Sequence, residues 1–135
     1  MEQVLTNTLV MVVDDSTDIC DLLRAALEHA GASVNVAQTV ETAIDTFRKH
    51  IPHAVIVDIR LGSSDGYALI KAIREHNVLY RGFTPAIAVT GFASPEDEER
   101  ALAAGFNRYI AKPFDPFDVV AAIAAMLYGR GSAVA

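Results

Sequence analysis

Three aspartates stand directly after short apolar runs of the chain. Asp14 and Asp15 follow the first run, and Asp58 follows the third. Carboxylates held close together repel one another, and each raises the pKa of the others unless a cation lies among them. Mg²⁺ prefers oxygen ligands and needs only one or two carboxylates beside other oxygens, so the set favours Mg²⁺ over Zn²⁺. The pattern therefore predicts a magnesium site, with Mn²⁺ as a second candidate.

A hydroxyl and an ammonium group stand after two further apolar runs. They belong to Thr90 and to Lys112, which precedes Pro113. A carboxylate can act as a nucleophile and take a phosphoryl group, which gives an acyl phosphate. Phosphoryl transfer depends on in-line positioning and on neutralisation of charge. A cation, the Lys112 ammonium and the Thr90 hydroxyl would together provide that neutralisation.

The apolar runs that precede these residues have the composition of buried strands. Val and Ile dominate them without strict polar alternation, which is typical of parallel strands covered on both faces. Stretches with the helical spacing of apolar residues follow each run. The fourth of these helices has a clear start, because Ser94 is a candidate N-cap and Pro95 suits the first helical position. The predicted strands are Leu9 to Val13, Val34 to Ala37, Ala54 to Val57, Ala86 to Val89 and Tyr109 to Ala111.

Five alternations of strand and helix predict a doubly wound α/β domain with right-handed crossovers. The expected fold is a five-stranded parallel sheet in the order 2-1-3-4-5, flanked by five helices. In this order the first, third, fourth and fifth strands are neighbours. The polar residues that follow these four strands should therefore converge on one pocket at the carboxyl edge of the sheet.

Composition limits the kind of protein further. The 135 residues suit one domain, and 52% hydrophobic against 21% charged residues excludes a disordered chain. With 11 basic and 17 acidic residues the net charge is −6, which argues against direct binding of nucleic acid. Cys20 is the sole cysteine and is expected to fill the core. No apolar run is long enough for a signal peptide or a membrane span, so we expect a soluble, cytoplasmic protein without membrane contact.

In this order and at these strand ends, Asp14-Asp15, Asp58, Thr90-Gly91 and Lys112-Pro113 resemble the receiver domain of two-component response regulators, including chemotaxis regulators. The resemblance covers residues 9 to 128 and implies a flavodoxin-like fold. Residues 1 to 8 then form an N-terminal tail, and residues 129 to 135 form a C-terminal tail or the start of a linker. The resemblance implies a phosphorelay switch and not an enzyme. A histidine kinase or a histidine phosphotransfer protein would donate the phosphoryl group, and a downstream protein would read the change.

The resemblance also assigns roles to residues of the predicted pocket. Asp58 resembles the phosphoacceptor, and the Lys112 side chain would contact the phosphoryl oxygens. The resemblance also implies that the peptide bond between Lys112 and Pro113 is cis. The family ligates Mg²⁺ through the carboxylates that correspond to Asp15 and Asp58, through the backbone carbonyl of Arg60, and through water on Asp14.

Further roles concern switching and the lifetime of the acyl phosphate. Thr90 and Tyr109 resemble the switch pair, which alters the face built from the fourth helix, the fifth strand and the fifth helix. Gly91 leaves space beside the acceptor. Our hypothesis is that Arg60 and Phe92 partly screen the acyl phosphate from water. Gly62 stands where the family most often has proline, so the loop after Asp58 is expected to be more mobile.

Four alternatives remain open at this point. The chain is either a stand-alone receiver or a receiver excised from a hybrid histidine kinase or a larger regulator. A Mg²⁺-dependent phosphatase of the haloacid dehalogenase kind also forms an aspartyl phosphate, but it typically uses Asp-x-Asp after the first strand, whereas Asp14 and Asp15 are adjacent. A flavodoxin-like protein that binds a flavin phosphate would find these aspartates repulsive. A degenerate receiver would serve only as a fixed docking module.

Overall fold

A computed structural model describes residues 3–60, 66–91 and 94–129 of the chain. Within this part of the chain, five parallel strands form one sheet in the order β2-β1-β3-β4-β5, which confirms the predicted α/β topology. The elements alternate in the order β1 (Leu9–Val13), α1 (Thr17–His29), β2 (Ser33–Ala37), α2 (Val40–Lys49), β3 (Ala54–Asp58), α3 (Gly66–Tyr80), β4 (Ala86–Thr90), α4 (Pro95–Ala104), β5 (Arg108–Ala111) and α5 (Pro116–Tyr128).

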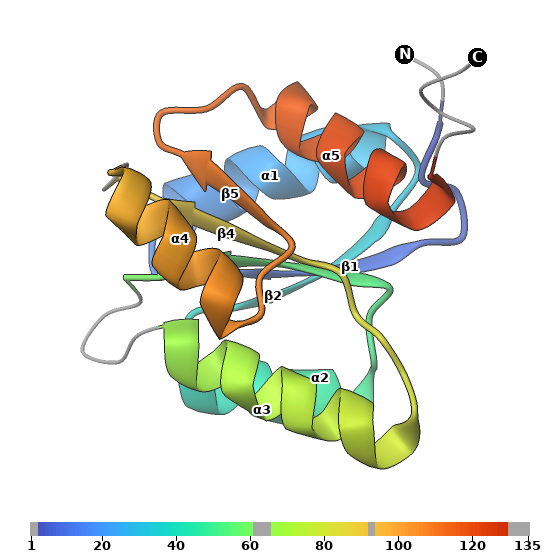
Figure 1. Ribbon diagram of the computed structural model, residues 1–135. Coiled ribbons are helices and arrows are strands. Elements are labelled where there is room, and N and C mark those ends of the chain that lie inside the picture. Colours follow the sequence, from blue (N-terminus) through green and yellow to red (C-terminus); the bar gives the residue numbers. More distant parts are fainter. Residues whose placement is uncertain (1–2, 61–65, 92–93, 130–135) are drawn as a thin grey trace.

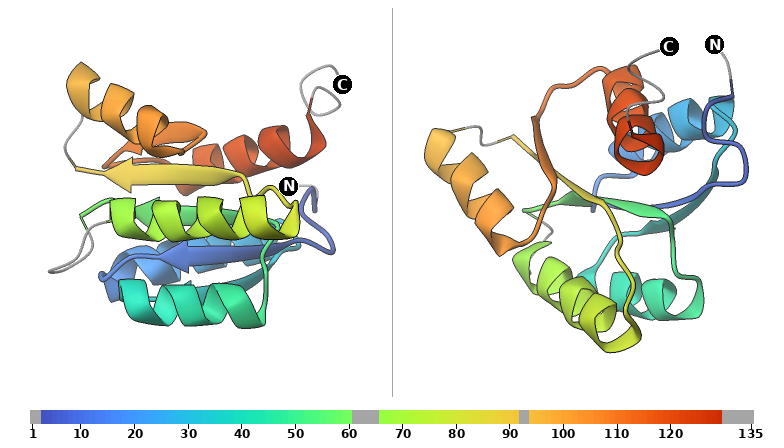
Figure 2. Two further views of the ribbon diagram at one scale, coloured as in Figure 1. Left: turned by 60° about the horizontal axis from the view of Figure 1, so that its bottom comes forward. Right: turned by 45° about the vertical axis from the view of Figure 1, so that its right-hand side comes forward.

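The helices cover both faces of the sheet and divide the core into two layers (Figures 1 and 2). Helices α1 and α5 pack on one face, where Leu23 and Ile123 are buried against Ile56 of the central strand β3. Helices α2, α3 and α4 lie on the other face, where Phe47 and Ile70 pack in the second core cluster. Because both faces are covered, the inner strands β1, β3 and β4 are apolar up to their carboxyl ends, whereas the edge strands β2 and β5 also carry Asn35 and Arg108.

Local sequence signals fix the helix starts. Ser16 caps α1, where its hydroxyl accepts from the Ile19 backbone N–H at 3.3 Å. Ser94 caps α4 and Asp115 caps α5, and in both helices proline follows the cap. Helix α4 ends at Gly105, whose φ of +123° strongly favours glycine. Each cap side chain accepts from a first-turn backbone N–H that has no partner within the helix, and so fixes where the helix begins.

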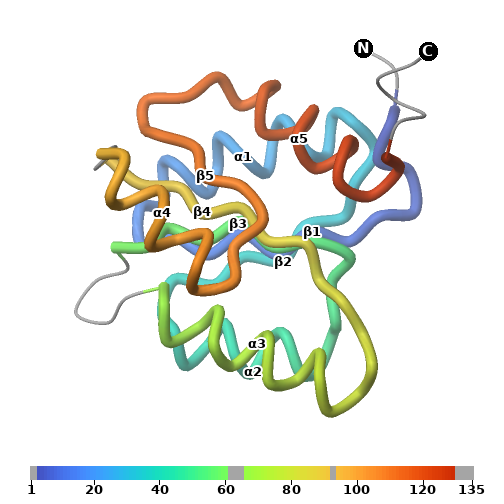
Figure 3. The backbone as a smooth tube through the Cα atoms, in the orientation of Figure 1, coloured from blue at the N-terminus to red at the C-terminus, as the bar shows by residue number. Residues whose placement is uncertain are grey.

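The segment that precedes β1 packs onto the domain, beside the end of α5 (Figure 3). Leu5 is fully buried in the core layer of α1 and α5, and its backbone N–H donates to the carbonyl of Ala30 at 2.8 Å. The hydroxyl groups of Thr8 and Tyr128 form a hydrogen bond at 2.5 Å. Part of the region that the sequence assigns to a tail therefore contributes to the core.

Helix α4 is the least embedded of the helices that the structure describes. Of its ten residues only Ala101 is buried, whereas α3 buries five and α1 and α5 bury four each. Its contacts are chiefly with α3 and β5. None of the described helices combines the length and the apolar character needed to cross a bilayer.

Candidate functional site

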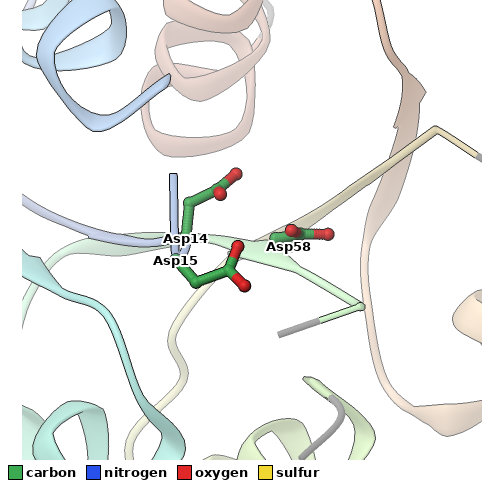
Figure 4. Close-up of side chains that lie close together, drawn as sticks. All are labelled: Asp14, Asp15 and Asp58. Carbon is green, nitrogen blue, oxygen red and sulfur yellow. The ribbon is translucent and has the colours of Figure 1, made fainter. Parts of the chain in front are cut away.

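Three carboxylates meet at the carboxyl edge of the sheet, as the strand ends predict. Asp14 and Asp15 follow β1, and Asp58 ends the adjacent strand β3 (Figure 4). Each offers an oxygen, and these oxygens all lie within 4.8 Å of one another. Asp14 and Asp58 are buried, whereas Asp15 is exposed. We refer to these three residues as the acidic pocket.

Backbone N–H groups and one ammonium group orient the two buried carboxylates. Asp14 accepts from the backbone N–H of Ser16 at 2.9 Å, and Asp58 accepts from that of Arg60 at 3.0 Å. The ammonium of Lys112 donates to Asp14 at 3.1 Å and to Asp58 at 3.5 Å. Lys112 therefore bridges the two buried acids from the end of β5.

Electrostatics in the acidic pocket are unfavourable to three ionised acids. Burial and the charge of Asp14 raise the pKa of Asp58, although Lys112 and the Arg60 N–H act in the opposite direction. For Lys112, burial lowers the pKa, but hydrogen bonds with Asp14 and Asp58 and their negative charges outweigh it, so the pKa is raised. One ammonium cannot neutralise three carboxylates. A set of three clustered carboxylate oxygens beside a single ammonium fits a hard divalent cation such as Mg²⁺.

The neighbouring strands β4 and β5 supply the other polar residues. Thr90 ends β4 and is buried, and its carbonyl accepts from the Lys112 N–H at 2.8 Å. The peptide bond between Lys112 and Pro113 is cis. Tyr109 lies on β5, partly buried on the face that α2, α3 and α4 cover. Burial, together with the negative charge of Asp97 on α4, raises the pKa of the Tyr109 hydroxyl.

Residues that the sequence did not single out surround Thr90 as well. The guanidinium of Arg100 on α4 lies 4.7 Å from the ring centroid of Tyr67 on α3. Tyr67 and Arg100 line a cavity of about 40 Å³ together with Arg60 and Thr90. No local pattern could have revealed this pair, because the two residues lie on different helices.

Two glycines near the pocket have different surroundings, because a side chain would clash at Gly66 but not at Gly91. A Cβ on Gly66 would lie 2.9 Å from a Val57 methyl and 3.0 Å from the Asp58 carbonyl oxygen, so the start of α3 can approach β3 only with glycine there. A Cβ on Gly91 would meet none of the described atoms within 4 Å, which leaves open space after Thr90. Phe92 and Gly62, for which the sequence suggested roles, lie outside the described residues.

Cys20 on α1 contacts the backbone of the acidic pocket. It is buried, as expected, and its thiol donates to the Asp14 carbonyl at 3.2 Å. Burial and the nearby Asp14 charge raise the pKa of the thiol to about 11. Since the thiolate is the reactive form, the raised pKa disfavours reactivity of Cys20, and its hydrogen bond supports the backbone at Asp14.

Comparisons with known proteins agree with this architecture. The family model described as the response regulator receiver domain matches residues 10–124. A receiver domain of a Francisella response regulator, 1452, superposes with a TM-score of 0.81 at 26% identity, covering 93% of this chain and 99% of that one. The BeF₃-activated DrrB receiver domain superposes with a TM-score of 0.79 at 26% identity, covering 90% and 97%. This chain belongs to the response regulator receiver domain family, which acts in two-component signalling.

Two relatives differ in how much of their length the chain spans. A protein of Leptolyngbya boryana named "Uncharacterized 14.6 kDa protein in sodA1 3'region" is 40% identical over 119 residues, which cover 87% of this chain and 88% of that one. The transcriptional regulatory protein YxdJ of Bacillus subtilis is 34% identical over 113 residues, which cover 84% of this chain but 47% of that one. The chain thus spans about half the length of the transcriptional regulator. Receiver domains are typically signalling switches rather than enzymes, and they imply a histidine kinase as partner.

Proposed function

We propose that this protein is a phosphoryl-accepting switch in which Asp58 is the acceptor. The observation that carries the proposal is the geometry of the acidic pocket, where the Asp58 carboxylate lies close to two further carboxylates and accepts from the Lys112 ammonium that bridges it to Asp14. An oxygen of Asp58 attacks the phosphorus of a phosphohistidine, the P–N bond breaks, and the imidazole leaves with its electron pair. The product is an acyl phosphate on Asp58.

Each neighbouring residue has a distinct part in this reaction. The Arg60 N–H holds one carboxylate oxygen of Asp58 and so fixes the orientation of the nucleophile. Lys112, already within 3.5 Å of Asp58, neutralises charge on the transferred group. Thr90 would donate its hydroxyl to a phosphoryl oxygen, and Tyr109 would follow it inward as the second member of the switch.

The divalent cation has a defined place in the pocket. Asp15 and Asp58 would hold Mg²⁺, or Mn²⁺, through their carboxylates, Arg60 through its backbone carbonyl, and Asp14 through water. When bound, the cation supplies charge neutralisation to the phosphoryl oxygens. Asp15 suits direct ligation because it is exposed, so its carboxylate can reach a cation that enters from solvent.

The proposed partners follow from the same chemistry. A histidine kinase or a histidine phosphotransfer protein donates the phosphoryl group, in the cytoplasm. The face formed by α4, β5 and α5 presents the altered surface to a downstream protein. Helix α4 supports this proposal because it is the helix with the fewest buried residues in the described chain. Whether the chain acts alone or within a larger regulator or hybrid kinase determines which protein reads that surface.

Acetyl phosphate provides a direct test. With Mg²⁺, the protein should incorporate one phosphoryl group and lose it slowly, and Asp58→Asn should abolish the incorporation. Asp45→Asn, an exposed aspartate on α2, is the matched control and should label normally. Labelling that persists in Asp58→Asn would refute Asp58 as acceptor. Continuous release of phosphate over many turnovers would instead indicate a phosphatase.

A further inference from the structure

The end of α3 exposes a group of large apolar side chains. Val78, Leu79 and Tyr80 in its last turn are 81%, 71% and 66% exposed, and Phe83 in the following turn is 65% exposed. Ile51, which lies just after the end of α2, is 54% exposed. The core does not use these residues, since α3 packs on the sheet through its Leu69, Ile70 and Ile73 face. Clustered exposed apolar residues of this size mark interaction sites in soluble domains.

These residues form one continuous surface, which we call the α3-end surface. Leu79 lines a groove of about 660 Å³ between α2 and α3 together with Ile51 and Tyr80. Leu79 also lines a groove of about 580 Å³ between α3 and α4 together with Val78 and the stem of Lys71. Phe83 joins the surface through Arg74, whose guanidinium lies 4.8 Å from the ring centroid of Phe83.

Positive charge surrounds the α3-end surface, although the chain as a whole carries a net charge of −6. Arg48 lines the first groove, and Lys71 and Arg74 line the second. Arg74 donates its hydrogen bonds to neutral acceptors, so no carboxylate in the described chain bonds to its charge. Glu75 is the one acid that lines either groove. The surface therefore combines apolar side chains with a basic rim.

We propose that the α3-end surface is a docking site for an acidic amphipathic helix of a partner protein. Such a helix would place its apolar side chains on Val78 and Leu79 in the groove between α3 and α4. Its acidic residues would lie opposite the Lys71 ammonium. Arg74 would contribute only its positive charge, because its five N–H groups already donate within the domain.

Charge and shape favour this occupant over two others. A second copy of the chain, docked about a two-fold axis, would bring the same basic rim face to face with itself. A membrane with anionic lipids would satisfy the charge, but a flat bilayer would leave the deeper groove between α2 and α3 unfilled. A helix fills a groove and carries the complementary charge.

The docking site is distant from the acidic pocket. Helix α3 begins beside β3 at Gly66 and runs for 15 residues, which is about 22 Å, to the opposite end of the domain (Figure 1). Binding there leaves Asp58 and the face of β5 and α5 accessible. The groove between α3 and α4 includes Ala104 of α4, so the test of docking uses the unphosphorylated protein, and its outcome does not depend on phosphoryl acceptance by Asp58.

The test uses two synthetic peptides and the isotopically labelled full chain. One peptide has leucines at i, i+3, i+4 and i+7 with glutamates beside them, and its twin has lysines in place of the glutamates. Amide shifts in NMR should follow titration with the acidic peptide and map to α3 and the turn after it. Leu79→Ser should weaken binding about tenfold or more, because the peptide would bury the Leu79 side chain in the complex. Lys71→Glu should weaken it about fivefold.

Matched variants on α1 serve as controls. Leu22 and Arg24 are an exposed leucine and an exposed arginine, and Leu22→Ser and Arg24→Glu should leave the affinity unchanged. All substituted residues are exposed, so circular dichroism should show every variant folded. Absent shifts at high peptide concentration, or equal binding of the lysine twin, would overturn the proposal.

Two further measurements separate the rival occupants. Co-sedimentation with phosphatidylglycerol vesicles that is lost in Leu79→Ser would assign the surface to a membrane. Self-association in analytical ultracentrifugation that is lost in the same variant would assign it to a second copy. Either result overturns the proposal. A protein that stays monomeric, does not bind the vesicles and binds the acidic peptide supports it.

Discussion

The Lys112 ammonium donates to the carboxylate of Asp14 at 3.1 Å, across 98 positions of sequence. This contact is shorter than the 3.5 Å contact of the same ammonium with Asp58. The resting position of Lys112 is therefore set mainly by an acid that is not the proposed acceptor. Lys112 then has to move only a short distance to reach a phosphoryl group on Asp58.

Removal of the Lys112 charge should destabilise the fold. In Lys112→Met, Asp14 and Asp58 lose the cation between them, so we expect a loss of about 1–3 kcal/mol of unfolding free energy at pH 7 without Mg²⁺. Urea unfolding in EDTA measures this loss. Lys49→Met is the matched control, because its ion pair with Asp45 joins side chains that are 67% and 64% exposed. The control should change stability by less than about 0.5 kcal/mol, and equal losses would contradict the bridging role of Lys112.

Asp58→Asn should stabilise the protein at neutral pH. The folded state raises the pKa of Asp58, through burial first and Asp14 second, so the folded state binds the Asp58 proton more tightly than the unfolded state does. Ionisation of Asp58 therefore costs stability as the pH rises through its raised pKa. Asparagine removes that cost, on the order of 1 kcal/mol, the scale of an ordinary substitution.

The pH dependence of the Asp58→Asn effect provides the check. Urea unfolding of both proteins in EDTA should show the gain in full at pH 7 and no gain below the ordinary aspartate pKa of 3.8, where both states are protonated. Asp21→Asn, an exposed position on α1, is the control. A variant less stable than the parent protein at pH 7 would show that the charge of Asp58 is well compensated.

Mg²⁺ should stabilise the folded protein through the acidic pocket. A ligand that binds only the folded state adds about 1.4 kcal/mol at ten times its dissociation constant. The thermal midpoint should rise with Mg²⁺ and return to its starting value in EDTA. Asp15→Asn should abolish the rise without harm to the fold, because Asp15 is exposed. A rise that persists in Asp15→Asn would place the cation elsewhere.

Arg74→Met should destabilise the domain by about 1–3 kcal/mol, because the acceptors on the buried residues Asn77 and Thr84 lose their donor. The Arg74 guanidinium donates to the carbonyls of Gly105 and Thr84 and to the side chains of Asn77 and Asn107, at 2.7 to 3.0 Å. It thereby joins α3 to the turns before β4 and β5. Chemical unfolding measures the loss, and Arg48→Met, at an exposed position, should cost little. A loss no larger than that of Arg48→Met would show that solvent replaces the network.

Most of the fold and the acidic pocket were predictable from sequence. Val and Ile runs identified the strands, and Ser94 with Pro95 marked the start of α4 correctly. The convergence of Asp14, Asp15 and Asp58 followed from strand order, because parallel strands in the order 2-1-3-4-5 bring these strand ends together. Strand identity and topology were sufficient for these predictions.

Other features depend on contacts that no local pattern encodes. The short pair Val4-Leu5 has no strand or helix pattern that marks Leu5 as a core residue. Its position depends on a contact with Ala30 at the end of α1, whose carbonyl accepts from the Leu5 N–H. In the sequence, Arg74 resembles an ordinary surface residue of a helix. Its hydrogen bonds depend on the carbonyls of Thr84 and Gly105, which lie in two turns distant in sequence. The cation–π contact between Arg100 and Tyr67 likewise requires α3 and α4 to be side by side.

The single buried residue of α4, Ala101, has an energetic consequence for the whole domain. Displacement of a helix exposes the apolar surface that it had buried, and the small side chain of alanine contributes little of that surface. Each of the other helices would expose two or three buried leucine, isoleucine, valine or phenylalanine side chains. Displacement of α4 therefore costs the least burial of any described helix, and we expect α4 to be the element that a local change of charge shifts most readily.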